Sequence, residues 1–428
     1  MLRTLFLIHL FWLIYCHVLS KALAEVPDVL KNPEDLVEPS KLMNGSVVPP
    51  LTDLLTADKI IASFGYKAEE HSVDTEDNER FTLKLFRIPA LKTRCRHRPK
   101  KPVVLFNHGM TGSADSWLIM GPKNGLPYLL SDVCNDVWLA NCRGTRYSKE
   151  RNPKIPDLHK YWDFSWHEIG MEDLPVIIDY ILDKTNHSAL HFVGYSQGAT
   201  TLMVLLSMRP EYNEKIKTAQ LLAPTVFMRQ SLNLIYKPLS PILKLMPDRE
   251  LLPTLKDLHN FLTNLCRRNS LKKVCKTWFL LSSGRVSRHM DRSVIPLLLA
   301  THPVGISTRQ QKHYFQLKYS GRFQQYDFGS SENKIRYNKP SPPIYPLQNV
   351  RPCSPIQLYY SKDDETVSPK DIYTLINNLR HTVVEHLITV RMFDHADFLF
   401  SITANMIVNV PVIGVITKYE LSNKKCQS

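Results

Sequence analysis

The stretch that decides the fold is Gly194-Tyr195-Ser196-Gln197-Gly198. A short apolar run, residues 189–193, precedes it, and an apolar stretch that suits a helix, residues 199–208, follows it. Glycines two positions before and after a serine favour a sharp strand-to-helix turn, because they have no Cβ to obstruct the close approach of the backbone. Such a turn exposes the central side chain at the start of a helix. The pattern therefore predicts that Ser196 is a nucleophile, provided that a base and an acid follow it in the chain.

Short apolar segments alternate with helical patterns along most of the chain. Most of the segments are apolar on both faces, as in strands of a buried parallel sheet. The alternation predicts an α/β fold in which helices flank a mostly parallel sheet. We expect strands at residues 81–88, 102–107, 136–140, 190–194, 219–222, 356–361 and 387–392, and helices at 126–133, 168–183, 197–208 and 369–380.

The alternation stops in residues 227–350. Many prolines and leucine-rich segments without regular strand spacing predict a mainly helical insertion, which divides the α/β core into residues 51–226 and 351–428. Ligands bind over the carboxyl edge of such sheets, where we expect the insertion to lie. Its leucines at helical spacing either pack into a core or form a cover that faces lipid. These are Leu251, Leu252, Leu255, Leu258, Leu262 and Leu265.

The N-terminus has the pattern of a signal peptide. Arg3 precedes an apolar run to Ser20, and the small-x-small sequence Ala22-Leu23-Ala24 follows. An uncleaved anchor is the alternative, but about 16 apolar residues interrupted by His9 and His17 are fewer than the roughly 20 that span a bilayer. We expect removal of residues 1–24, an irregular segment at 25–50, and a protein secreted or delivered to the lysosomal lumen.

The 428 residues are 43% hydrophobic and carry a formal charge of +14. This composition allows one large core to form without a metal. The basic residues are spread along the chain without a zinc-finger or basic-helix pattern, which argues against a nucleic-acid partner. A basic surface favours contact with anionic lipid interfaces instead. We predict no cofactor and no metal site.

The secretory route would permit two modifications. Asn44 and Asn186 begin Asn-x-Ser sequons and are candidate glycosylation sites. Eight cysteines become seven if Cys16 leaves with the signal peptide, so at least one thiol stays free or pairs between chains. Cys266 and Cys275 bracket a polar, basic loop, and the residues alone leave open whether the two are bonded. The pattern assigns no role to Cys95, Cys134, Cys142, Cys353 and Cys426.

A serine nucleophile needs an imidazole base and a carboxylate that orients it. In this type of fold the chain order is serine, acid, histidine. His395 follows the last predicted strand and is favoured over its nearest rivals, His167 and His313. The acid is expected in the loop after strand 356–361, where the spacing favours Asp363 or Asp364 and does not separate them. The alternative role for that loop is to cap the next helix.

An oxyanion hole requires two backbone amides aimed at the position where negative charge develops. The residue after the nucleophile, Gln197, supplies one. The other belongs in the loop after an early strand, and Asn107-His108-Gly109-Met110 follows strand 102–107 directly. We therefore expect the amide of Met110 to be the second donor.

Several blocks, in this order, resemble the acid lipase family, the gastric and lysosomal type of lipase in the α/β-hydrolase superfamily. The likeness runs from about residue 56 to residue 413. The blocks are Phe64-Gly65-Tyr66, Thr75-Glu76-Asp77, Asn107-His108-Gly109, Asn141-Cys142-Arg143-Gly144, Tyr161-Trp162-Asp163-Phe164-Ser165, Asp173-Leu174-Pro175, Val193 to Gly198 and His302-Pro303-Val304-Gly305.

The resemblance implies an α/β-hydrolase fold, a triad of Ser196, Asp364 and His395, and an oxyanion hole of Met110 and Gln197. It also implies a disulfide between the cysteines at 266 and 275, and a cap with a movable lid over an acyl-binding cleft. Members of the family commonly have leucine in place of Met110, and the acidic loop leaves Asp363 as an alternative.

The implied function is hydrolysis of lipid esters at a lipid–water interface, with triacylglycerol or cholesteryl ester as substrate and an acyl-enzyme intermediate. A catalytically silent lipid-binding relative is the alternative, because folds outlive functions. The enzyme is favoured because the serine, the aspartate and the histidine are all present in order.

Overall fold

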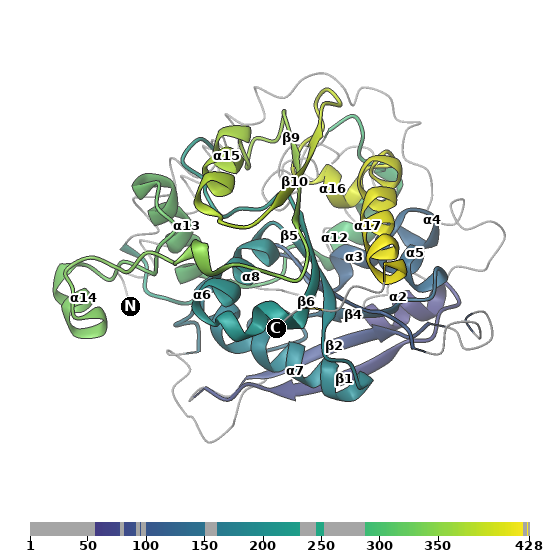
Figure 1. The fold of residues 1–428 in the computed structure, drawn as a ribbon, viewed down its shortest axis with the longest axis horizontal. Coiled ribbons are helices and arrows are strands. Elements are labelled where there is room, and N and C mark those ends of the chain that lie inside the picture. The colour runs from purple at the N-terminus through teal and green to yellow at the C-terminus, as the bar shows by residue number, and fades with distance from the viewer. Residues whose placement is uncertain are drawn as a thin grey trace, which may run out of the picture.

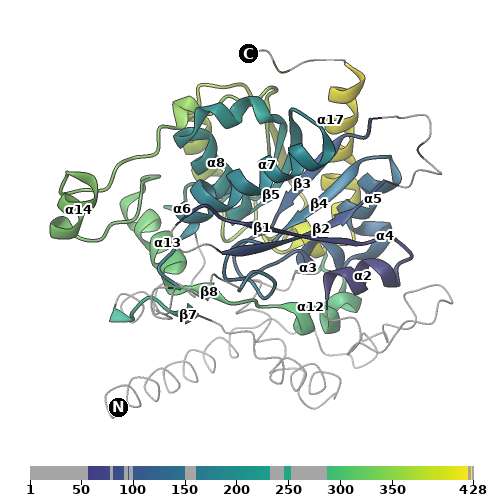
Figure 2. The ribbon, with the colours of Figure 1, turned by 90° about the horizontal axis from the view of Figure 1, so that it is seen from below.

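The computed structural model describes residues 56–77, 81–90, 95, 100–149, 161–231, 245–251, 287–422 and 426. Within these residues, eight strands form one sheet in the order β1-β2-β4-β3-β5-β6-β9-β10 (Figure 1), and β7 pairs with β8 in a separate ribbon (Figure 2). The strands are β1 (Glu69–Asp74), β2 (Thr82–Ile88), β3 (Val103–Asn107), β4 (Asp136–Ala140), β5 (Leu190–Tyr195), β6 (Ile216–Leu222), β7 (Glu250–Leu251), β8 (Ile306–Ser307), β9 (Ile356–Ser361) and β10 (Val383–Ile388).

Helices connect the strands and cover both faces of the sheet. In Figure 1, α8 and α15 lie on one side of the central strands, and α5 and α17 lie on the other. The α-helices are α2 (Ala57–Ser63), α3 (Asp115–Leu118), α4 (Gly121–Asn124), α5 (Leu126–Asp132), α6 (Trp166–Glu168), α7 (Leu174–Thr185), α8 (Gln197–Met208), α12 (Ile295–Thr301), α13 (Thr308–Ser320), α14 (Ser330–Tyr337), α15 (Pro369–Asn378), α16 (Asp397–Phe400) and α17 (Val410–Leu421). Short 3-10 or π turns are η4 (Ile169–Asp173), η5 (Pro210–Lys215), η7 (Arg292–Val294), η8 (Leu347–Asn349) and η9 (Asn405–Asn409).

Six neighbouring strands, from β4 to β10 in the sheet order, run parallel, whereas β1 and β2 are antiparallel. The connection after β3 leads to β4 on one side, whereas the connection after the adjacent strand β5 leads to β6 on the other. A crevice forms at such a switch point, at the carboxyl ends of the strands. The loops after β3, β5, β9 and β10 all start from this edge, which is where the predicted site residues lie in the chain.

The predicted mostly parallel α/β fold is confirmed, and two of its details are wrong. The last strand is not residues 387–392: β10 covers Val383–Ile388, and residues 389–394 form a loop before His395. Strand β1 was not predicted, because its sequence, Glu-Glu-His-Ser-Val-Asp, is mostly polar. Both are edge strands, and an edge strand with partly exposed faces lacks the apolar run that marks a buried one. The central strands β3, β4, β5 and β9 are buried along their whole length.

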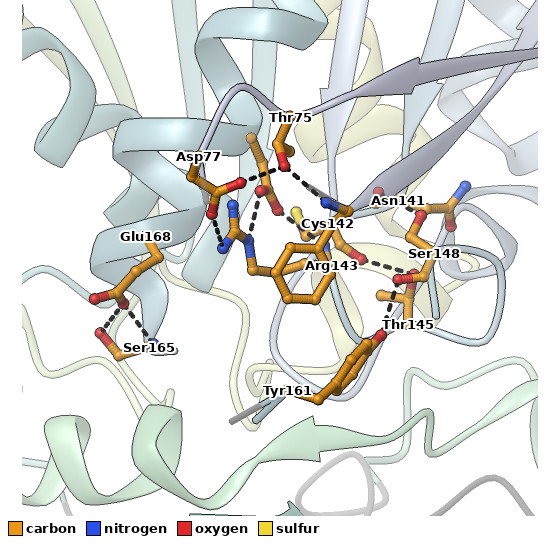
Figure 3. A network of polar contacts seen from close by, with 12 residues as sticks. Thr75, Asp77, Asn141, Cys142, Arg143, Thr145, Ser148, Tyr161, Ser165 and Glu168 are labelled. Atoms are coloured by element: carbon orange, nitrogen blue, oxygen red, sulfur yellow. Dashed lines mark hydrogen bonds and ion pairs between the residues drawn. The ribbon is translucent and has the colours of Figure 1, made fainter. Parts of the chain in front are cut away.

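A buried ion-pair network holds the loop after β4 in place (Figure 3). Nε of Arg143 lies 2.6 Å from Asp173, and its Nη1 lies 2.8 Å from Asp77 in the connection between β1 and β2. Burial lowers the pKa of Arg143, but the two carboxylates raise it above its usual value. Loss of one partner from a buried pair costs about 3 to 5 kcal/mol. Asp77, Arg143 and Asp173 belong to three of the sequence blocks given above, so these distant blocks meet in one ion-pair network.

The described part of the insertion, residues 227–231, 245–251 and 287–350, contains α12, α13 and α14. It also contains the small β7–β8 ribbon, which was not predicted from the sequence. In Figure 2, α12 and the ribbon lie on the same side of the sheet as α3. The leucine stripe beyond Leu251 and the pair Cys266 and Cys275 lie outside the described residues, as do the signal peptide, residues 25–50 and Asn44. No helix in the described ranges is long and apolar enough to cross a membrane.

Two disulfides link cysteines that the sequence analysis left unassigned. Cys95 is bonded to Cys134, and Cys353 to Cys426. Cys142 is a buried free thiol whose Sγ lies 3.2 Å from Oδ1 of Asn107. Disulfides are typical of proteins that fold in an oxidising compartment.

Candidate active site

Ser196 lies at the junction of β5 and α8, in a backbone conformation that is strained for a residue with a side chain. Its φ is 51° and its ψ is −113°. The flanking glycines explain how the turn fits. A Cβ on Gly198 would lie 2.2 Å from the carbonyl oxygen of Asn107, and one on Gly194 would lie 2.9 Å from the amide nitrogen of Ala199. Because the backbone lies so close to β3 at Gly198 and to the start of α8 at Gly194, only glycine fits at these positions. The turn leaves the serine side chain at the start of the helix.

His395 lies between Ser196 and Asp364. Its Nε2 is 2.9 Å from Oγ of Ser196, and its Nδ1 is 2.9 Å from Oδ2 of Asp364. The imidazole is 13% exposed and the aspartate side chain is fully buried. The three side chains therefore form one continuous chain of hydrogen bonds, although 199 residues separate the serine from the histidine.

The two aspartates that the sequence left open have different surroundings. Asp364 is buried, and its Oδ1 accepts hydrogen bonds from the amides of Thr366 and Val367 at 2.7 and 2.9 Å. These bonds orient Oδ2 toward His395. Asp363 is exposed, and its Oδ2 accepts a hydrogen bond from the amide of Met392 at 2.6 Å. Asp364 is thus the one of the two whose carboxylate contacts the imidazole.

The surroundings of His395 favour its protonated form more than water does. Burial lowers its pKa, but the charge and hydrogen bond of Asp364 and the charge of Asp394 outweigh this effect and raise the pKa above 6.5. Since a carboxylate only accepts, Nδ1 carries a hydrogen and donates it to Asp364. In the neutral ring Nε2 is then the lone-pair nitrogen that faces the serine.

The two rival histidines have structural contacts. His313 stacks on Trp166 at 3.7 Å between ring centres, and its two nitrogens lie within 3.0 Å of Ser165 and Gln324. Burial lowers its pKa to about 3, so it stays neutral in the core. Nδ1 of His167 lies 2.8 Å from the hydroxyl of Tyr345.

The loop after β3 lies against the nucleophile turn. A Cβ on Gly109 would lie 3.3 Å from Cβ of Ser196. His108 Nε2 accepts from the amide of Cys142 at 3.2 Å, so its Nδ1 is the protonated nitrogen and donates to the carbonyl of Gly109 at 2.8 Å. The C=O and N–H of a trans peptide point in opposite directions. The bond that holds the Gly109 carbonyl therefore also fixes the direction of the Met110 amide.

The other predicted donor, Gln197, is the first residue of α8, where amides have no acceptor within the helix. The insertion contacts the loops of both predicted donors. The side chain of Gln310 donates to that of Gln197 at 3.2 Å, and the amide of Val304 donates to the carbonyl of Thr111 at 2.8 Å.

A small cavity, with room for about one water molecule, lies behind these loops. It is too small for an acyl chain. Its lining includes Gly109, Cys142, Arg143, Gln197, Gly305 and Gln310.

Sequence reasoning missed three side chains around the histidine. The hydroxyl of Tyr195 donates to the carbonyl of His395 at 3.0 Å. Asp394 and Asp397 are both buried next to the imidazole loop. The available signal was the Asp-His-Ala-Asp sequence itself, because two carboxylates beside a candidate base alter its electrostatic surroundings.

Known proteins with similar sequences reveal the family. Residues 57–121 match a partial alpha/beta-hydrolase lipase region, and residues 102–401 match the alpha/beta hydrolase fold. Lipase 1 of Drosophila melanogaster is 34% identical over 393 residues, which cover 91% of this chain and 84% of that protein. Gastric triacylglycerol lipase is 30% identical in Bos taurus, over 96% of this chain and 99% of that protein. The gastric triacylglycerol lipase of Homo sapiens is 32% identical, over 88% of this chain and 94% of that protein.

The chain belongs to the gastric-type acid lipase family of α/β hydrolases. This confirms the resemblance that the sequence blocks indicated, and it makes the protein a lipase, a carboxylic ester hydrolase. The lipase carries the predicted nucleophile, base and acid on the loops after β5, β10 and β9, at the carboxyl edge of the sheet where this type of fold binds ligands.

Proposed function

We propose that this lipase hydrolyses the ester bonds of neutral lipids, with triacylglycerol as the main substrate class, through an acyl-enzyme on Ser196. The observation that carries the proposal is the continuous chain of hydrogen bonds from Ser196 through His395 to Asp364. A serine hydroxyl by itself is a weak nucleophile, and such a chain removes its proton as it attacks.

In the first half of the reaction, Oγ of Ser196 attacks the ester carbonyl carbon while its proton moves to Nε2 of His395. The carbonyl oxygen becomes negatively charged and accepts hydrogen bonds from the amides of Met110 and Gln197. Asp364 stabilises the imidazolium through Nδ1 without taking its proton. The bond to the alcohol then breaks, and Nε2 donates the proton to the departing alkoxide oxygen. An acyl-enzyme and a free alcohol result.

In the second half, a water molecule attacks the acyl carbon and gives one proton to Nε2 of His395. The same two amides stabilise the second oxyanion. The bond between the carbonyl carbon and Oγ of Ser196 breaks, and the proton returns to the serine oxygen. A free fatty acid leaves, and the enzyme is restored. Loss of one oxyanion donor typically lowers kcat by about 10²- to 10³-fold.

Two considerations support the substrate class. Two of the relatives above are named for triacylglycerol. The net charge of +14 favours an anionic lipid surface, and we propose that residues 227–350 form a cap, which is consistent with the contacts of Val304 and Gln310. We also propose secretion or lysosomal delivery after removal of residues 1–24, a disulfide between Cys266 and Cys275, and glycosylation at Asn44 and Asn186. Asn186 is exposed at the C-terminal end of α7.

A fluorophosphonate probe tests the nucleophile. We expect it to label the folded protein at Ser196, and Ser196→Ala to abolish labelling and lower kcat/KM by about 10⁴- to 10⁶-fold. Ser207→Ala is the matched control, because Ser207 is a buried serine of the same helix whose hydroxyl bonds to the carbonyl of Val204. A Ser196→Ala variant with wild-type ester hydrolysis would refute the mechanism. The site around Ser196 would then only bind lipid.

Emulsified substrates test the substrate class. We expect release of fatty acid from triacylglycerol to exceed release from cholesteryl ester at equal surface concentration. The reverse ranking would assign the lipase to cholesteryl esters while retaining the mechanism.

A further inference from the structure

Asp394 contacts both of the loops that carry the acid and the base. Its Oδ1 accepts a hydrogen bond from the amide of His395 at 2.7 Å and another from the amide of Glu365 at 3.0 Å. Glu365 directly follows Asp364 in the chain. One carboxylate oxygen of Asp394 therefore links the backbone of Glu365 to the backbone of His395, although Glu365 and Asp394 are 29 residues apart in the sequence.

The contact controls a distance on which the proposed reaction depends. The loops after β9 and β10 are carried by neighbouring parallel strands, whose paired residues end at Ser361 and Ile388 with one further bond, from the amide of Lys362 to the carbonyl of Ile388. Beyond those residues the two loops need other contacts to stay in register. A displacement of about 1 Å in a catalytic group costs on the order of 10²-fold in rate. Asp394 supplies a contact between the loops directly beside the pair formed by Asp364 and His395.

Asp394 is itself held by a second carboxylate. Oδ2 of Asp397 accepts from the amide of Asp394 at 2.7 Å, and Oδ1 of Asp397 accepts from the hydroxyl of Ser287 at 2.5 Å. Ser287 belongs to the insertion, and the next residues bond to the same region, since the amide of Asp291 donates to the carbonyl of Phe400 at 2.8 Å. The position of Asp394 is thus fixed from the insertion as well as from the core.

We propose that Asp394 is a positioning residue of this lipase: its Oδ1 bridges the amides of Glu365 and His395 and holds the triad acid and base at hydrogen-bond distance. The proposal rests on the proposed function, because it assigns Asp394 a role in the reaction of Ser196. Asp394 does not touch the substrate or the reacting atoms.

The charge of Asp394 gives a second, independent readout. Burial, followed by the charge of Asp364, raises the pKa of Asp394 from 3.8 to about 6, although the two amides and the charge of His395 lower it. Above that pH the carboxylate is charged, and its charge raises the pKa of His395. The other titratable groups that face this cluster are Asp397 and, from the insertion, His289. Removal of the charge of Asp394 alone would therefore lower the pKa of the base.

Two substitutions separate the bridge from the charge. Asp394→Asn keeps an oxygen that accepts both amides and removes the charge. We expect kcat within about threefold of wild type, and an acid limb of kcat/KM that moves to lower pH. Asp394→Ala removes the bridge and leaves two amides without acceptors. We expect kcat to fall by about 10- to 100-fold with KM for a soluble ester little changed.

Asp371→Ala is the matched control. Asp371 is a buried aspartate of α15 that accepts from the amide of Gln230 at 3.0 Å. The Asp371→Ala substitution should lower the free energy of unfolding without changing kcat per folded molecule. The fraction of protein labelled by the fluorophosphonate gives the number of folded molecules.

Three outcomes would overturn the proposal. The first is a folded Asp394→Ala variant with wild-type kcat. The second is an Asp394→Asn variant as slow as the alanine variant. The third is an Asp394→Asn variant whose acid limb of kcat/KM lies at the same pH as that of the wild type. This outcome decides the question if the alanine variant does not fold. If Ser196→Ala keeps full activity, the proposed function fails first; if only the Asp394 variants behave as wild type, the positioning role alone fails.

Discussion

Oδ2 of Asp364 lies 2.9 Å from Nδ1 of His395, although the two residues are 31 positions apart and start from different strands. Strands β9 and β10 are adjacent and parallel, so their carboxyl ends deliver the two loops to the same place. Asp363, the neighbouring residue, is exposed and bonds instead to the amide of Met392. These two neighbouring carboxylates therefore differ in role: Asp364 contacts the imidazole of His395, and Asp363 holds the backbone of the loop after β10 at Met392.

The first prediction compares these two aspartates. Asp364→Asn should lower kcat by about 10⁴-fold, because an amide in that place favours the wrong imidazole tautomer. Asp363→Asn should leave kcat within about twofold, since the amide oxygen can still accept from Met392. Initial rates on a soluble ester, corrected for the labelled fraction, measure both. Equal losses in the two variants would contradict the assignment of the acid to Asp364.

The second prediction concerns the turn around Ser196. Gly198→Ala places a methyl group 2.2 Å from the carbonyl oxygen of Asn107, so strand β3 and helix α8 must separate. We expect a loss of about 3 kcal/mol in the free energy of unfolding, together with loss of fluorophosphonate labelling. Gly414→Ala in α17 is the control. It has open space around it, and alanine favours a helix by about 0.5 to 1 kcal/mol. A stable, labelled Gly198→Ala variant would argue against this turn.

The third prediction counts thiols in the mature chain. Two disulfides use Cys95, Cys134, Cys353 and Cys426, and Cys142 is 2% exposed. A thiol reagent should not react with Cys142 in the native protein. It should find one after unfolding without reductant if Cys266 and Cys275 are bonded, and three if they are not. Cys142→Ser should remove the single thiol that appears on unfolding.

The fourth prediction is a pH effect on stability. Glu420 of α17 lies 2.9 Å from Nε2 of His191 and 2.8 Å from Nζ of Lys217. Burial raises the pKa of Glu420, but these two hydrogen bonds and their charges lower it from 4.5 to about 2. An acid with a depressed pKa stabilises the fold above the unfolded-state value, and this contribution is lost as the pH falls toward 2.

Glu420→Gln should therefore cost about 1 to 2 kcal/mol near neutral pH, with a difference that narrows between pH 4.5 and pH 2. Urea unfolding at several pH values measures the difference. Glu332→Gln is the control, since Glu332 forms an exposed pair with Arg336 within one helix. A constant difference across the pH range would mean that the glutamate stabilises α17 by packing and not by its charge.

The buried strands and helices were predictable, and the edges of the sheet were not. Strands β3, β4 and β9 begin and end within one residue of prediction, because burial on both faces demands a continuous apolar run. Strand β1 is polar and pairs with one neighbour, so its position depends on β2 and not on its own residues. The site shows the same division: the local turn around Ser196 can be read from its glycines, whereas Asp394 acts on two loops that the sequence does not bring together.

The sequence by itself determined the type of fold, the family, and the residues proposed as nucleophile and base, because glycine spacing, apolar runs and chain order are local properties. Only the tertiary structure decided which aspartate contacts His395, which cysteines are bonded, and that Asp394 bridges the acid and base loops. Each of these depends on the distance between segments far apart in the chain. That distance is set by the order and register of the strands, which no short stretch of sequence specifies.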